Sequence, residues 1–423
     1  MSGNPIFCAN LQNFATKEDF RTYSRFMKMI DYNSETFTRA VNSITTLDEL
    51  KTILGSGRQL RIKYGVDVTA PALHIGHAVN LWKMRELQNA GHKVVFLIGD
   101  FTTRVGDPTG RVESRKKIET ADISKWAKEF LKQVGMILRT DKKVFEVRKN
   151  SEWYLRMKLD EFLNILSLFT HARLIGRDMF KERIKKGKEI TAPELIYPIL
   201  QGYDSVMIKS DITIVGSDQL FNENIGRMLQ EKFGQSPQTV VTTAITPGLD
   251  GGQKMSKSLG NYIGISDTPK DKFGKAMRLL DKLIVSYLEV YTDVFLAKIR
   301  EIESELKHDK NPMAAKLFFA ESLVARYHGA NIAKKEREEF SRVFSKKEMP
   351  ENITAVSIKP GAWKAIDLII AAKLARSKSE ARRLIIQKAI EIDGMAILIP
   401  HQEVEVKKGS IIRAGKRKFI KLA

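Results

Sequence analysis

Two histidines separated by an isoleucine and a glycine are the most distinctive chemical feature of the sequence. His74 and His77 flank Gly76, and they stand where the turn-rich loop of residues 67–73 gives way to a predicted helix. The first turn of a helix presents unpaired N–H groups and a positive dipole, so it binds phosphate well. Imidazole N–H groups also stabilise oxygens whose charge grows in a transition state. The segment indicates phosphate chemistry, against the alternative of two ordinary, partly buried histidines.

A second segment, KMSKS at residues 254–258, suits the same kind of ligand. Glycines border it at positions 251, 252 and 260. Two lysines and two serines on a loop suit a triphosphate, and the glycines allow the loop to close over it. A plain basic surface loop is the alternative for this segment alone, but the two segments together are far more specific than either.

Three further polar residues share a helical spacing. Tyr197, Gln201 and Asp204 stand at positions i, i+4 and i+7, which places them on one face of a predicted helix. Apolar neighbours at positions 198–200 favour a face turned toward a binding site. The alternative is a polar helix face turned toward water.

The elements that must position these residues alternate between short β-rich runs and longer helical runs. This alternation predicts an α/β domain with a Rossmann-like, doubly wound parallel sheet. A capping box at Thr46 and Glu49 opens the first helix, which ends at residues 55–57. The predicted strands are 61–66, 94–98, 144–147, 212–215 and 240–243, and predicted helices include 78–90 and 125–134.

The pattern changes toward the C-terminus. Residues 46–268 form the predicted catalytic domain, and residues 269–345 have helical periodicity. Residues 346–361 read as a linker, and 362–423 as a small α+β domain. From residue 360 onward there are 14 Lys/Arg and 6 Asp/Glu, a net charge of +8. A basic face of this kind predicts RNA binding, with a solvated charged surface as the alternative.

Composition narrows the class of protein. The 423 residues carry 71 basic and 50 acidic side chains, a net charge of +21, which favours a polyanionic partner. The single cysteine, Cys8, allows no disulfide framework and no cysteine zinc cluster. No run approaches 18 apolar residues, and the N-terminus does not read as a secretion signal. We therefore expect a cytoplasmic protein without a membrane span.

These segments together resemble a known family. A HIGH signature at residues 74–77 followed by KMSKS at 254–258 resembles the class I aminoacyl-tRNA synthetases. The runs GDFTTRVGDPTGR (99–111), YPILQGYD (197–204) and GSDQ (216–219) are similar to tyrosyl-tRNA synthetases of the bacterial type. The resemblance covers about residues 46–423, and it includes a C-terminal part similar to an S4 RNA-binding domain.

The resemblance implies a two-step reaction. Tyrosine and ATP would give tyrosyl-adenylate and pyrophosphate, and the tyrosyl group would then pass to the terminal adenosine of tRNA(Tyr). Mg²⁺ would accompany ATP, held mainly by phosphates and water, with no metal site made by the protein. A homodimer is expected from the family.

The same resemblance assigns roles to individual residues. The residues implied to act on the phosphates are His74, His77, Lys254 and Lys257. Those implied to bind ATP are Gly76, Asp218, Gln219, Lys257 and Ser258. Those implied to bind tyrosine are Asp107, Tyr197 and Gln201 at the ammonium group and Asp204 at the phenol, and those implied to contact tRNA are Lys378, Arg382 and Arg383.

Two positions depart from the family pattern. Many relatives have a phenol-contacting tyrosine where this sequence has Lys63, with Tyr64 one residue later. A step of one residue turns a side chain to the other face of a sheet, so Tyr64 is no simple substitute. In the S4-like part, Lys388 stands where a glycine is usual, which predicts a looser turn. Residues 1–45 form an extension without an assigned role.

Three other functions compete with tyrosine activation. The tryptophan enzyme shares the architecture, but Asp204 and the S4-like part argue against it. A small-molecule nucleotidyltransferase also uses HxGH, yet it does not need KMSKS together with two RNA-binding domains. A non-catalytic RNA-binding protein derived from a synthetase would not be expected to keep both signatures intact.

Overall fold

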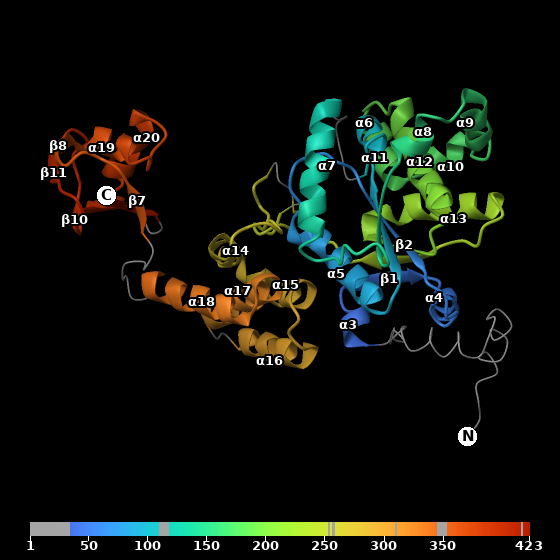
Figure 1. The fold of residues 1–423 in the computed structure, drawn as a ribbon, viewed down its shortest axis with the longest axis horizontal. Coiled ribbons are helices and arrows are strands. Elements are labelled where there is room, and N and C mark those ends of the chain that lie inside the picture. The colour runs from blue at the N-terminus through green and yellow to red at the C-terminus, as the bar shows by residue number, and fades with distance from the viewer. Residues whose placement is uncertain are drawn as a thin grey trace, which may run out of the picture. The chain divides into compact units, whose positions relative to one another are not determined.

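The computed structural model describes residues 34–109, 118–252, 254–255, 259–308, 311–344, 353–415 and 418–423. They belong to two compact units, Met1–Ala330 and Asn331–Ala423. A six-stranded sheet lies at the centre of the first unit (Figure 1). Its strands are β1 (Val41–Thr45), β2 (Arg61–Val66), β3 (Lys93–Ile98), β4 (Phe145–Lys149), β5 (Ile212–Gly216) and β6 (Thr239–Thr243).

The sheet is parallel except at one edge. The strand order is β1-β6-β5-β2-β3-β4, and only β1 runs antiparallel to its neighbour, β6. The five predicted strands are confirmed to within a few residues. The polar pattern before residue 46 did not predict β1, because an edge strand that stays partly exposed along its length lacks a buried face.

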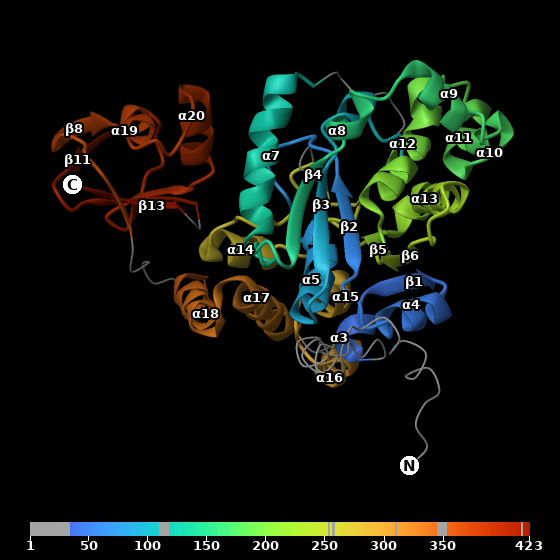
Figure 2. The ribbon, with the colours of Figure 1, turned by 45° about the vertical axis from the view of Figure 1, so that its right-hand side comes forward.

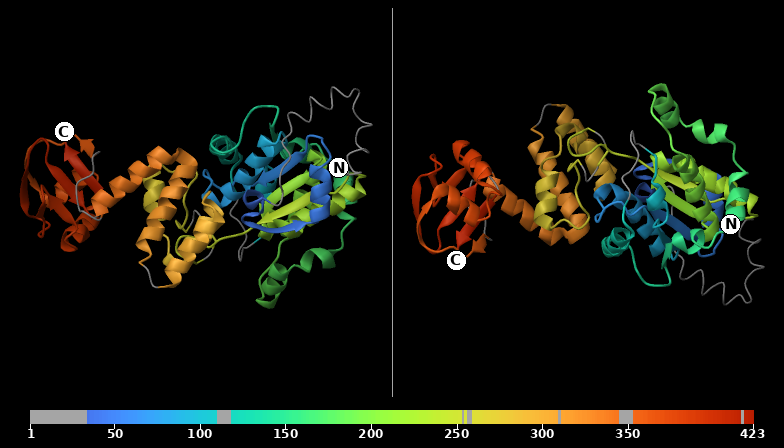
Figure 3. Two further views of the ribbon diagram at one scale, coloured as in Figure 1. Left: turned by 90° about the horizontal axis from the view of Figure 1, so that it is seen from below. Right: turned by 90° about the horizontal axis from the view of Figure 1, so that it is seen from above.

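Helices cover both faces of this sheet, as expected for a doubly wound fold (Figure 2). One face packs against α5 and α7, and the other against α8 and α12. The helices of this part are α3 (Glu35–Thr38), α4 (Leu47–Leu54), α5 (Ile75–Asn89), α6 (Thr102–Val105), α7 (Thr120–Val134), α8 (Ser151–Tyr154), α9 (Leu159–Leu166), α10 (His171–Ile175), α11 (Asp178–Lys185), α12 (Ala192–Ile208) and α13 (Leu220–Lys232). Figure 3 shows the short green helices α9 to α11 standing away from the sheet.

Capping decides where the site-bearing helices begin. Helix α5 starts at Ile75 rather than at the predicted residue 78, because His74 takes the extended N-cap conformation. Helix α12 starts after Thr191, whose backbone N–H donates to Glu194 Oε2 at 2.9 Å. At α4, Thr46 is the N-cap but makes no side-chain capping bond, so the expected capping box does not form.

Helices follow the sheet in sequence, as predicted. They are α14 (Pro269–Ala276), α15 (Ile284–Tyr291), α16 (Leu296–Lys307), α17 (Met313–His328) and α18 (Ala330–Phe344). The described residues between 269 and 344 include no strand. In the described part of the chain, no helix is long and apolar enough to cross a membrane.

The described part of the C-terminal unit combines most of α18 and two further helices with two small sheets around a core of its own, and these sheets are antiparallel except where β7 pairs with β13. Its elements after α18 are β7 (Thr354–Val356), β8 (Gly361–Lys364), α19 (Ala365–Ala371), α20 (Lys378–Ile386), β9 (Ile390–Ile392), β10 (Met395–Ala396), β11 (Glu403–Val406), β12 (Ile411–Ala414) and β13 (Lys418–Leu422). Ser377 caps α20 as predicted, accepting from Glu380 N. Lys388 closes this helix with a φ of 54°, the left-handed conformation that glycine adopts most easily.

Candidate active site

A cavity of about 300 Å³ lies where the strand order of the sheet reverses, between β2 and β5. Ligands of doubly wound sheets bind at this point, beside the carboxyl ends of the strands. Ten residues predicted from the sequence line it: His74, Gly76, His77, Asp107, Tyr197, Gln201, Asp204, Asp218, Gln219 and Lys254. The predicted residues Lys257 and Ser258 lie outside the described residues.

The two histidines stand together at the start of α5. Their ring centroids are 3.9 Å apart, and His77 Nδ1 accepts from the backbone N–H of His74 at 3.2 Å. A Cβ on Gly76 would lie 2.9 Å from His74 Nδ1, too close for an alanine without a shift of that ring. The glycine is therefore required for the placement of the first histidine as well as for access to the backbone.

The histidine segment is also joined to the chain that follows KMSKS. The backbone N–H of Ile75 donates to Ile263 O, and that of Ile265 donates to Leu73 O, both at 3.0 Å. These bonds hold the histidine segment next to residues 263–265, although the two are far apart in sequence. Lys254, from the first position of KMSKS, forms a 3.1 Å ion pair with Asp218.

The polar face of α12 is turned into the cavity rather than toward water. Tyr197 is 6 % exposed and Asp204 is 4 % exposed. The hydroxyl of Tyr197 donates to Asp67 Oδ2 at 3.0 Å, and Asp67 Oδ1 accepts from Thr102 at 2.8 Å. The spacing of i, i+4 and i+7 thus correctly predicted one face, whose three residues line the cavity, with Tyr197 and Asp204 buried and Gln201 partly buried.

The carboxylate of Asp204 is held by two donors. Trp153 Nε1 donates to Oδ1 at 3.0 Å, and Asn150 Nδ2 donates to Oδ2 at 3.3 Å. Burial raises the pKa of Asp204 to about 7, while Lys63 and the donors to the carboxylate act in the opposite direction. Each carboxylate oxygen keeps acceptor capacity for one further donor from the cavity.

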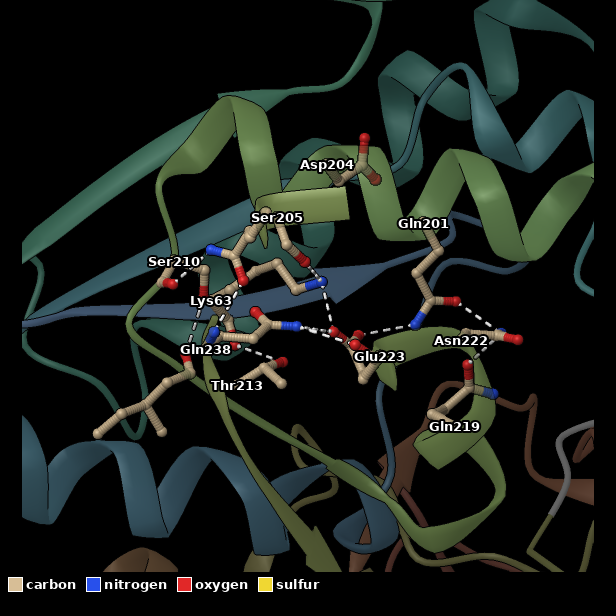
Figure 4. Close-up of polar contacts among 12 residues, drawn as sticks. Lys63, Gln201, Asp204, Ser205, Ser210, Thr213, Gln219, Asn222, Glu223 and Gln238 are labelled. Carbon is tan, nitrogen blue, oxygen red and sulfur yellow. Dashed lines mark hydrogen bonds and ion pairs between the residues drawn. The ribbon is translucent and has the colours of Figure 1, made fainter. Parts of the chain in front are cut away.

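Lys63 also lines the cavity but is committed to protein partners. Its Nζ donates to Glu223 Oε2 at 2.7 Å and to Ser205 Oγ at 2.6 Å, and both charged side chains are almost fully buried (Figure 4). Tyr64 packs beside Phe96, with ring centroids 5.9 Å apart, in the hydrophobic core of the face that carries α5 and α7. Tyr64 therefore belongs to the opposite face of the sheet from Lys63, as the step of one residue predicted, although it also contributes to the lining of the cavity.

The loop after β3 contributes Asp107. Gln219 Nε2 donates to Asp107 Oδ2 at 3.0 Å, and the backbone N–H of Thr109 donates to Oδ1 at 2.9 Å. Gln219 belongs to the short 3₁₀ segment η2 (Ser217–Gln219), directly after β5. The structure thus brings together two residues that the sequence had predicted separately.

Five residues whose side chains hold the predicted cavity residues were not identified from the sequence: Asp67, Asn150, Trp153, Asn222 and Glu223. Asp67 had a signal, because it directly follows β2 at the edge where ligands bind. The other four have none in their local pattern, since their partners lie on other elements. Among the described residues, no group of three or more His, Cys, Asp or Glu side chains could hold a metal ion.

The residues predicted to contact tRNA belong to the C-terminal unit. Lys378, Arg382 and Arg383 are exposed on α20. Lys378 forms a 3.2 Å ion pair with Asp367, which neutralises part of its charge.

The first comparison with known proteins defines the class. The sequence model of the family described as tRNA synthetases class I (W and Y) matches residues 56–345. This match covers the five parallel strands β2 to β6, the cavity and the helices that follow, so the chain belongs to the class I tRNA synthetases of the W and Y type.

Similar proteins define the branch within that class. The chain is 42 % identical over 385 residues to the tyrosine–tRNA ligase of Dehalococcoides mccartyi, covering 90 % of this chain and 96 % of that one. It is 42 % identical over 386 residues to the tyrosine–tRNA ligase of Thermotoga maritima, with 91 % and 96 % covered. The chain is thus a tyrosine–tRNA ligase.

Solved structures support the fold independently. A C-terminally truncated mitochondrial tyrosyl-tRNA synthetase of Aspergillus nidulans superposes with a TM-score of 0.60 at 21 % identity, covering 78 % of this chain and all of that one. The tyrosyl-tRNA synthetase of Archaeoglobus fulgidus complexed with L-tyrosine gives 0.54 at 22 % identity, with 72 % and 98 % covered. The Rossmann-like core predicted from the sequence is confirmed.

Proposed function

We propose that the cavity joins tyrosine to ATP and then to the 3′-terminal adenosine of tRNA(Tyr) through the residues described above. In the first step a carboxylate oxygen of tyrosine attacks the α-phosphorus, and pyrophosphate leaves with the bridging oxygen. In the second step a ribose hydroxyl of the tRNA attacks the tyrosyl carbonyl carbon, and AMP leaves. Neither step needs a bond to the protein, so its residues act by positioning and by stabilising charge.

The observation that carries the assignment is the buried carboxylate of Asp204. With Trp153 and Asn150 as donors, its remaining acceptor capacity suits the phenolic hydroxyl of tyrosine. Phenylalanine would leave this buried acceptor without its partner, which costs binding energy, and tyrosyl-tRNA synthetases are a standard example of such discrimination.

The ammonium group of tyrosine is assigned to Asp107, Tyr197 and Gln201. All three line the cavity and offer oxygen acceptors. Because the Tyr197 hydroxyl donates its proton to Asp67, its oxygen is left as an acceptor. Three acceptors match the three N–H bonds of an ammonium group.

ATP is assigned to the opposite part of the cavity. His74 and His77 would donate to phosphate oxygens, with Gly76 allowing close approach to the backbone at the start of α5. Asp218 would bind the ribose, and Gln219 would lie beside the tyrosine carboxylate or the α-phosphate. Lys254 and Lys257 would follow the charge of the departing pyrophosphate, and Ser258 would contact ATP. Mg²⁺ would enter with ATP as part of the substrate, held by phosphates and water.

The C-terminal residues are assigned to tRNA. We infer an S4-like domain over 362–423, joined by a linker over 346–361 to a helical domain over 269–345 on the anticodon side. The exposed residues Lys378, Arg382 and Arg383 support a contact with phosphates. A homodimer in the cytoplasm completes the proposal, as expected from the family.

The test of the activation step is amino-acid-dependent ATP–pyrophosphate exchange with tyrosine, tryptophan and phenylalanine. We expect exchange with tyrosine alone. Absence of exchange with tyrosine, or faster exchange with tryptophan, would contradict the assignment of the cavity.

The test of the RNA assignment is removal of residues 360–423. We expect exchange to stay near the level of the full chain while tRNA charging falls steeply. An equal loss of both activities would contradict the modular arrangement.

A further inference from the structure

We propose that the buried ion pair between Lys63 and Glu223 is a positioning device that fixes the Gln201 amide for the ammonium group of tyrosine. The inference rests on the proposed role of Gln201 as an ammonium acceptor. It assigns a purpose to a buried ion pair whose two residues line the cavity.

The pair is the centre of a closed hydrogen-bond network. Glu223 Oε2 accepts from Lys63 at 2.7 Å and from Gln238 Nε2 at 2.8 Å, and Glu223 Oε1 accepts from Gln201 Nε2 at 2.8 Å. Lys63 donates in addition to Ser205. A buried carboxylate needs such compensation to remain ionised, and an ionised carboxylate only accepts.

This last property decides how Gln201 is oriented. Because the Glu223 carboxylate cannot donate, Gln201 must turn its NH₂ group toward it. This requirement distinguishes the nitrogen of the Gln201 amide from its oxygen, which similar shapes would otherwise leave interchangeable. The Gln201 oxygen then accepts from Asn222 Nδ2 at 2.9 Å and keeps a second lone pair. A flipped amide would present N–H groups to the substrate ammonium, where two donors oppose each other.

The network continues to a second proposed ammonium ligand. Asn222 Nδ2 donates at 3.1 Å to Gln219 Oε1, and Gln219 Nε2 donates to Asp107. Two of the three ammonium acceptors therefore take their orientation from one chain of bonds that begins at Lys63. In Figure 4 the side chain of Gln201 points toward Glu223 and Asn222, while that of Asp204 points away from them. The hydrogen bonds of the device therefore reach the ammonium end, whereas Lys63 acts on Asp204 at the phenol end only through its charge.

A purely structural role is the competing explanation, and the same unit offers a matched control. Arg183 and Glu194 form a second buried ion pair at 2.6 Å, with 7 % and 8 % exposure, between α11 and α12. Neither residue lines the cavity. If burial of charge alone mattered, disruption of either pair would have the same consequence for substrate binding.

The experiment uses the full chain and two tyrosine analogues as competitive inhibitors of exchange. Tyramine keeps the ammonium and phenol groups, and 3-(4-hydroxyphenyl)propionate keeps the phenol and carboxylate but lacks the ammonium. The test variant is the double substitution Lys63→Met with Glu223→Gln, since a glutamine at position 223 can donate as well as accept. The control is Arg183→Met with Glu194→Gln. Asn222→Ala breaks the same network without touching a buried charge, and it covers the case in which the test variant does not fold.

In the test variant and in Asn222→Ala, we expect the KM for tyrosine and the inhibition constant of tyramine to rise together by about tenfold. The inhibition constant of the propionate and the KM for ATP should change by less than about twofold. In the control variant, both KM values and both inhibition constants should change by less than about twofold. Equal weakening of both analogues, or the same changes in the control, would overturn the inference.

A separate variant, Gln201→Met, distinguishes failure of the inference from failure of the underlying proposal. If it leaves tyramine inhibition unchanged, the ammonium role of Gln201 is wrong and the inference falls with it. If it weakens tyramine while the network variants do not, the role of Gln201 stands and only the positioning device is refuted.

Discussion

The two ends of the cavity are built by different means. At the end assigned to tyrosine, Asp204 and Glu223 are almost fully buried, and each accepts from fixed donors. At the end assigned to ATP, Lys254 is 52 % exposed and pairs with an Asp218 that is itself partly exposed. Selection among similar amino acids requires preorganised partners, whereas binding and releasing a triphosphate favours groups that can move.

The largest change in activity is expected from a substitution in the part of the cavity assigned to tyrosine. Asp204→Ala should lower kcat/KM for tyrosine in the exchange reaction by about 1,000-fold, because the phenol loses its acceptor and Trp153 and Asn150 lose theirs. The KM for ATP should stay within about twofold, since the residue is remote from the assigned phosphates. Equal loss of ATP affinity would show that Asp204 has a structural role.

The second prediction addresses the ATP end. His74→Ala or His77→Ala should lower kcat of exchange by about 100-fold, as expected for loss of a donor to transition-state charge. Binding of tyrosine, measured by equilibrium dialysis without ATP, should be unchanged. A drop in tyrosine affinity of the same size would mean that the two ends are not separable.

The third prediction concerns the pH dependence of tyrosine binding measured without ATP. Asp204, with its pKa raised to about 7, is ionised above that pH and protonated below it. Since the ionised form is the better acceptor for the phenol, tyrosine affinity should rise by about tenfold between pH 6 and pH 8. Asp204→Asn should flatten this dependence, and an unchanged profile in that variant would assign the titration to another group.

The same shift has a consequence for stability. A carboxyl whose pKa is raised by folding contributes stability that is fully present below its unfolded pKa and is lost as the pH rises through about 7. The Tm of the ligand-free protein should therefore fall between pH 4 and pH 7 more steeply than that of Asp204→Asn. Parallel curves would contradict the assignment.

The last prediction compares how much two ion pairs, Lys254–Asp218 and Lys63–Glu223, contribute to the free energy of unfolding. The smallest effect is expected for the first pair. Lys254→Met should change the free energy of unfolding by less than about 1 kcal/mol, because its pair with Asp218 is open to solvent. Glu223→Gln, which leaves Lys63 buried without its counter-charge, should cost about 3–5 kcal/mol in urea denaturation. Similar losses of unfolding free energy in the two variants would mean that the tyrosine and ATP ends of the cavity are equally rigid.

Much of the fold could be predicted because its signals are local. A continuous apolar run located β3, and strand–helix alternation indicated the doubly wound sheet. The edge strand β1 was missed, since its pairing with β6 joins residues about 200 positions apart and leaves no periodic signature. The start of α5 was placed three residues late because histidine is an uncommon N-cap.

The sequence by itself determined the family, the two signature segments and the polar face of α12, because motif order and helical period are written in neighbouring residues. Only the tertiary structure decided which partners these side chains have. Lys63 meets Glu223 across 160 positions, and Trp153 meets Asp204 across 51. A buried charge must find a counter-charge wherever the fold brings one, and no local pattern records that position.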